Sequence, residues 1–145
     1  MRENLETNAM VLDTNILLDL FVFEDPATNG LREAIDGLSH RWLATVAMRE
    51  ELLRVLVYPQ IAKRMAARHL AASEVLHRFD QRVCIVAEAA KAPYTCKDAD
   101  DQKFIDLAVA HRAVLLSKDA AVLCMARRLV RLGVTVSRHW VSAPT

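Results

Sequence analysis

Short apolar runs alternate with segments of helical spacing along the chain, and this alternation constrains the fold more than any other feature. Between the runs, apolar residues recur about one helical turn apart. Short apolar strands separated by helices are typical of a parallel sheet covered on both faces. The sequence therefore predicts an α/β fold, a three-layer α/β/α domain with a central, mainly parallel sheet and residues 1–145 in a single domain. Strands are expected at Met10–Leu12, Arg41–Ala44, Val83–Val86, Val114–Leu116 and Val134–Val136.

Helix boundaries are predicted from capping residues. Thr45 is expected to cap a helix that runs through Leu56, and Ser73 to cap one that runs to Asp80. A single helix is expected over Asp119–Leu132, because Gly133 then stands where helices end. The other helices are expected at Asn15–Phe23, Leu31–Leu38, Ile61–His69 and Asp101–His111.

Composition limits the classes of function. The 145 residues are 53% hydrophobic and 26% charged, with a net charge of +1, so any contact with nucleic acid has to come from a local basic patch. No apolar run approaches the ~20 residues of a membrane span, and the acidic first residues do not resemble a signal peptide. The three cysteines lack metal-binding spacing and are expected to be reduced thiols. We therefore expect a cytoplasmic protein with no membrane association.

Four acidic residues fall where strands and loops lead into helices. Asp13 directly follows the first strand, and Asp119 follows Val114–Leu116 after two residues. Asp101 begins a helix after a polar loop, and Glu51 lies inside the helix that follows the second strand. Because the carboxyl ends of parallel strands share one edge, these acids can converge there. Converging carboxylates repel one another, and a ligand set of oxygens suits Mg²⁺ or Mn²⁺, which serve in phosphoryl transfer.

Each acid also has a simpler interpretation. Asp13, Asp101 and Asp119 could each cap the following helix. Glu51 could be a solvated helix residue, with Glu50 beside it as an equal candidate. Asp13, however, is embedded between two apolar runs, where a surface acid is unexpected. The joint pattern therefore favours a shared site, and capping does not exclude metal binding, since each carboxylate has two oxygens.

Four motifs in order carry a family resemblance. They read VLDTNILLDL, EELLRVLVYPQI, CKDADDQKFIDLA and VLLSKDAAVL. In these segments the chain resembles the PIN domain ribonucleases, most closely the branch of toxin components of toxin–antitoxin systems related to VapC-type toxins. The resemblance implies a single PIN domain that hydrolyses RNA phosphodiester bonds with Mg²⁺ or Mn²⁺. It also implies an antitoxin protein as partner and a homodimer or higher oligomer.

The resemblance also assigns roles to residues. The catalytic and metal-binding acids become Asp13, Glu51, Asp101 and Asp119, with Glu51 preferred over Glu50 for its position before Val55, Leu56 and Pro59. The supporting polar residues are Asn15, Ser117, Asp100 and Asp98.

Basic residues near these motifs are candidates for RNA binding. They are Lys118, Arg54, Arg64 and Arg68, although ordinary solvated helix faces explain the arginines as well. The alternative function is a PIN-like module that binds nucleic acid or protein without cleavage. A phosphotransfer receiver is disfavoured because no acidic pair precedes Asp13, and a Rossmann module because the chain has only three glycines.

Overall fold

The computed structural model describes residues 9–140; residues 1–8 and 141–145, including nearly all of the segment examined for a signal peptide, lie outside that description. Within it, five parallel strands form one sheet in the order β3-β2-β1-β4-β5. This confirms the predicted three-layer α/β/α architecture. The strands are β1 (Ala9–Leu12), β2 (Arg41–Ala44), β3 (Cys84–Ile85), β4 (Val114–Leu116) and β5 (Thr135–Ser137).

Strand β1 occupies the centre of the sheet. Its Val11 pairs with Leu43 of β2 on one side and with Leu115 of β4 on the other. All four residues of β1 are buried, because strands bond to both edges and helices cover both faces. The backbone N–H of Asp13 then donates to the carbonyl of Leu116 at 3.0 Å, so the hydrogen bonds between β1 and β4 continue up to Asp13.

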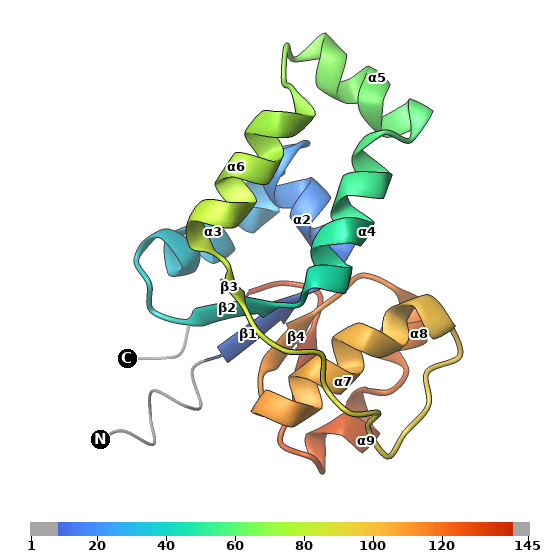
Figure 1. Cartoon of the computed structure of the whole chain (residues 1–145). Helices are drawn as coiled ribbons and strands as arrows, with labels where there is room; N and C mark the ends of the chain where they lie inside the picture. Colours follow the sequence, from blue (N-terminus) through green and yellow to red (C-terminus); the bar gives the residue numbers. More distant parts are fainter. Residues whose placement is uncertain (1–8, 141–145) are drawn as a thin grey trace.

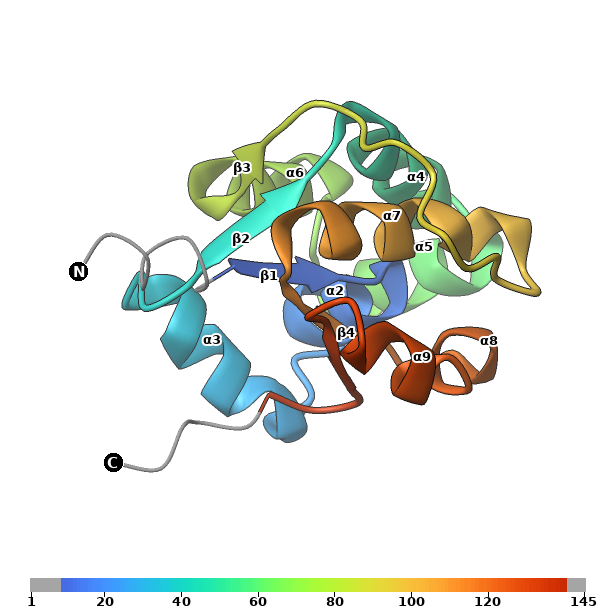
Figure 2. The ribbon, with the colours of Figure 1, turned by 90° about the horizontal axis from the view of Figure 1, so that it is seen from below.

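The helices lie on both sides of the sheet. In Figure 1, α2, α4, α5 and α6 lie above it, whereas α7 and α9 lie below. Helix α7 contacts β1 and β4, and Figure 2 shows it close to these strands in the view from below. The helices are α2 (Thr14–Phe21), α3 (Asn29–Asp36), α4 (Val46–Leu56), α5 (Pro59–Ala67), α6 (Ala72–Arg82), α7 (Gln102–His111), α8 (Ala120–Leu123) and α9 (Ala126–Val130), with short 3₁₀ turns η1 (Pro26–Thr28) and η2 (Ala99–Asp101).

Aromatic packing fixes the upper helices on the sheet. Trp42 of β2 meets Phe79 of α6 edge-on at 5.0 Å and lies 6.0 Å from Phe21 of α2. On the other face, Phe104, with 1% of its surface exposed, anchors α7. Both faces of the central strand β1 are therefore covered. No helix in residues 9–140 is long and apolar enough to cross a membrane.

Two predicted caps are confirmed and one is wrong. Thr45 accepts a hydrogen bond from the backbone N–H of Met48, and Gly133 adopts a left-handed φ of +85° just past α9. Ser73, by contrast, lies inside α6, whose N-cap is Ala71. The Glu74 carboxylate accepts from the Ala71 N–H at 3.1 Å, so a side chain from the first turn does the capping.

The helix predicted over Asp119–Leu132 is two shorter helices, α8 and α9. The N–H of Met125 bonds to the carbonyl of Val122, three residues back, which tightens the chain at this point. The carbonyl of Ala121 instead accepts from the thiols of Cys124 and Cys96. Side-chain donors thus replace the backbone donor that a continuous helix would supply.

Candidate active site

Asp13 extends from the centre of the sheet, and its side chain is held by Ser117. The carboxylate, with only 4% of the residue exposed, makes no capping bond to α2. Its Oδ2 accepts a 2.6 Å hydrogen bond from Ser117 Oγ, and the same Oγ accepts from the backbone N–H of Asp119 at 3.0 Å. The fully buried Ser117 therefore joins the acids that follow β1 and β4.

Asp119 combines the two roles considered from the sequence. Its Oδ1 accepts from the N–H of Ala121 at 2.8 Å and so caps α8. One carboxylate oxygen is committed to this bond, and Oδ2 remains available to a ligand. The capping bond therefore orients the Asp119 carboxylate and does not prevent it from binding a metal ion.

Among residues 9–140, Asp98, Asp101 and Asp119 form a close group of acids. One carboxylate oxygen from each lies within 4.8 Å of the other two. Asp101 is 7% exposed, and within residues 9–140 its buried Oδ2 has no hydrogen-bond partner. Asp98, expected only as a supporting residue, thus lies in the cluster itself, while exposed Asp100 contributes its backbone to the turn around Asp98.

Glu51 approaches from α4 and is already engaged. Its Oε2 accepts from the Thr14 hydroxyl, and its Oε1 lies 2.5 Å from Lys103 Nζ. Neighbouring Glu50 is exposed, which agrees with the preference for Glu51. Thr14 and Lys103 were missed from the sequence, although Lys103 lies only two residues beyond Asp101, in the first turn of α7.

Burial and neighbouring negative charges raise the pKa values of Asp13 and Asp101. Burial, reinforced by the charges of Asp13 and Asp119, raises the pKa of Asp101 to about 7. Burial also raises the pKa of Asp13, and the hydrogen bond from Ser117 opposes this shift, while the charge of Glu51 adds to it. Crowded, partly dry carboxylates of this kind would be relieved by a bound cation.

The donor set fits a divalent metal ion. Asp98, Asp101 and Asp119 offer only oxygen atoms, which are the ligands of Mg²⁺ and Mn²⁺. The orphaned Asp101 Oδ2 is a second, independent sign, since buried polar atoms in proteins normally have partners. Asp13 lies near this group, since its charge contributes to the raised pKa of Asp101, and the charge of Glu51 contributes to the raised pKa of Asp13.

The predicted basic residues make contacts of their own. Lys118 Nζ lies 2.5 Å from Asp19, and Arg68 binds both the carbonyl of Val22 and the Glu24 carboxylate. The Arg64 guanidinium lies 4.6 Å above the ring of Phe23, whereas Arg54 is exposed on α4.

Asn15, a predicted supporting residue, is exposed at the start of α2.

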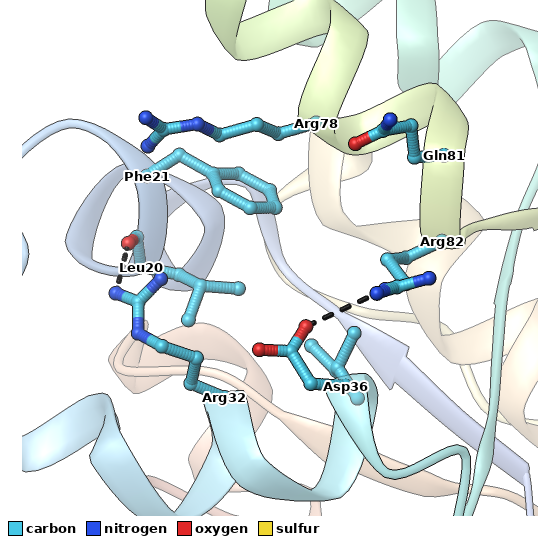
Figure 3. A pocket seen from close by; sticks show the side chains of 8 residues that line it. Leu20, Phe21, Arg32, Asp36, Arg78, Gln81 and Arg82 are labelled. Atoms are coloured by element: carbon cyan, nitrogen blue, oxygen red, sulfur yellow. Dashed lines mark hydrogen bonds and ion pairs between the residues drawn. The ribbon is translucent and has the colours of Figure 1, made fainter.

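A separate arginine-lined pocket of about 220 Å³ opens between α2, α3 and α6 (Figure 3). It lies at the far end of α2 from Asp13, about 12 Å away for eight helical residues. Its arginines already have partners: Arg32 donates to the carbonyl of Leu20 at 2.6 Å, and Arg82 to Asp36 at 3.4 Å. Because Asp36 lies between them, the chain itself supplies the anion of this pocket.

Comparison with protein families gives one match. The family described as PIN domain matches residues 9–121, from the first residue of β1 into α8. The matched range contains each of the acids described above. No curated protein matches the chain.

Proposed function

Because the chain belongs to the PIN domain family, whose members are generally metal-dependent nucleases, we propose that it is a Mg²⁺- or Mn²⁺-dependent endoribonuclease. The observation that carries this proposal is the buried Asp101 Oδ2 beside Asp98 and Asp119, which has no hydrogen-bond partner among residues 9–140. A buried carboxylate oxygen without a donor costs free energy unless a cation binds it. A cation bound at this cluster would remove that cost.

In this proposal, different acids bind the metal ion and orient the water. Asp101 and Asp119, with Asp98, would hold the metal ion. A bound Mg²⁺ or Mn²⁺ activates a water and offsets negative charge at a scissile phosphate. Asp13, held by Ser117 at 2.6 Å, would orient the attacking water, because its position is fixed by a buried hydrogen bond.

The substrate class and the biological role are further parts of the proposal. RNA is proposed because the four motifs resemble PIN ribonucleases, and the same resemblance supports a toxin held by an antitoxin protein. The homodimer or higher oligomer rests on that resemblance as well. Exposed Arg54, which shares α4 with Glu51, is the basic residue that we propose to contact the RNA backbone.

Cleavage of a mixed-sequence single-stranded RNA tests the proposal. The wild type is compared with Asp13→Asn and Asp119→Asn in Mn²⁺, in Mg²⁺ and in EDTA. Glu50→Gln is the matched control, because it removes one exposed negative charge beside Glu51. We expect cleavage by the wild type and the control only with metal, and a loss of at least ~100-fold in both Asp variants.

The same experiment distinguishes a nuclease from the alternative, a binding module that does not cleave. Mn²⁺ binding without cleavage of RNA would favour the PIN-like module that binds and does not cut. Absence of both metal binding and cleavage would show that these acids serve only as caps and hydrogen-bond acceptors.

A further inference from the structure

Lys103 places a positive charge in contact with Glu51. Its Nζ lies 2.5 Å from Glu51 Oε1 and donates to the carbonyl of Asp100 at 2.5 Å. The same ammonium lies 5.0 Å from the ring of Phe104. The side chains of Lys103 and Glu51 are only 23% and 19% exposed, so water screens this pair less than a surface ion pair.

Both oxygens of Glu51 are occupied by contacts within the chain. Thr14 donates to one oxygen and Lys103 pairs with the other. Asp101 differs, because its Oδ2 has no partner in the part of the chain that is described. Asp101 and Glu51 are therefore not equivalent. Asp101 has an oxygen open to a metal ion, whereas Glu51 is already paired with the Lys103 ammonium.

From these contacts we propose that Lys103 is a built-in counterion that competes with the metal ion for Glu51. The inference rests on the proposed metal site. In the absence of metal, Lys103 neutralises one charge among the acids and stabilises the fold. When metal binds, Glu51 can join it only by giving up the ammonium, so Lys103 weakens metal binding.

Replacement of the Lys103 ammonium by a metal ion at Glu51 requires only a side-chain movement. Lys103 belongs to the first turn of α7, two residues after Asp101, whereas Glu51 belongs to α4. The pair thus bridges the elements that carry Glu51 and Asp101. A long, flexible lysine side chain can leave Glu51 without movement of either helix.

Calorimetric titration with Mn²⁺ tests the proposal without reference to activity. Lys103→Met keeps most of the length of the side chain and removes its charge, Lys103→Arg keeps the charge, and Lys63→Met removes an exposed charge on α5 as a control. We expect Lys103→Met to bind Mn²⁺ about tenfold more tightly than the wild type, in the range of coupling between contacting residues. Lys63→Met is expected to match the wild type within about twofold.

A double-mutant cycle with Glu51→Gln shows whether the effect passes through Glu51. We expect the gain from Lys103→Met to fall to about twofold or less in the Glu51→Gln background. An equal gain in both backgrounds, or no gain in either, would overturn the competition between Lys103 and the metal. If the wild type itself does not bind Mn²⁺, the proposed metal-dependent function fails, and a wild type that binds while Lys103→Met is unchanged rejects this inference alone.

Discussion

Ser117 Oγ donates a 2.6 Å hydrogen bond to Asp13 Oδ2, and this bond connects the ends of the two adjacent strands β1 and β4. Both residues are buried, and the same Oγ receives the backbone N–H of Asp119. A single hydroxyl therefore fixes one acid by its side chain and another by its backbone. Removal of this hydroxyl should affect two acids at once.

Ser117→Ala should lower both RNA cleavage and stability. The substitution leaves Asp13 Oδ2 and the N–H of Asp119 without their partner, which we expect to cost about 1–3 kcal/mol of unfolding free energy. Loss of alignment at the acids should reduce kcat by about 10–100-fold. Urea denaturation and single-turnover cleavage measure the two effects. Ser117→Thr keeps the hydroxyl and should recover most of the activity; equal loss in both variants would indicate packing damage instead.

Asp101 should make the metal-free protein less stable as pH rises. Its pKa is about 7 in the folded chain against 3.8 as the ordinary value, so the folded state binds more protons than the unfolded state between these values. The unfolding free energy contributed by Asp101 therefore falls as pH rises from about 4 to 7. In EDTA at pH 8, Asp101→Asn should melt a few degrees (~3 °C or more) above the wild type.

The pH dependence of the difference between Asp101→Asn and wild type isolates this effect. His40 acts in the opposite direction, because burial lowers its pKa, but it is present in both proteins. The gap in melting temperature should narrow as the pH falls to 4 and below, because Asp101 becomes protonated in both states only below its ordinary pKa of 3.8. A gap that stays constant from pH 4 to pH 8 would show that burial of an ionised Asp101 carries no cost.

Much of the site follows from the positions of acids at strand ends. Asp13 and Asp119 were predicted to lie together because parallel neighbours end at one edge, and Ser117 does link the two. The contact between Lys103 and Glu51 could not be predicted, since it depends on how α7 and α4 pack across the sheet edge. Long side chains reach partners that no local pattern specifies.

The strands could be predicted from the local sequence, whereas some helix limits could not. The central strand β1 is a continuous apolar run because it is covered on both faces. The split between α8 and α9 depends instead on thiols of Cys96 and Cys124 at one carbonyl, and Cys96 comes from a distant loop. Periodicity along residues 119–132 continues through the break and gives no sign of it.

Mn²⁺ should stabilise the wild type and leave Asp119→Asn unchanged. A ligand that binds only the folded state at 100 times its Kd adds about 2.7 kcal/mol to the unfolding free energy. The amide of Asp119→Asn can still cap α8 but offers a weaker, neutral ligand, so the fold should persist while the response to Mn²⁺ disappears. Thermal melts with and without Mn²⁺ measure this difference, and EDTA should reverse it in the wild type. An equal rise in melting temperature for both proteins would place the metal away from Asp119.

Gly133→Ala should destabilise the fold, because this residue has a left-handed φ of +85° and an added Cβ would lie 3.2 Å from the Arg112 side chain. We expect a loss of about 1–2 kcal/mol in unfolding free energy, since non-glycine residues rarely adopt this conformation. Gly30→Ala is the matched control: Gly30 lies in α3, and the nearest atom to its added Cβ is in Trp140 at 3.7 Å. Alanine favours helices, so this control should be unchanged or up to ~1 kcal/mol more stable in urea denaturation. Equal stability of the two variants would mean that the chain passes from α9 into β5 without needing the left-handed residue.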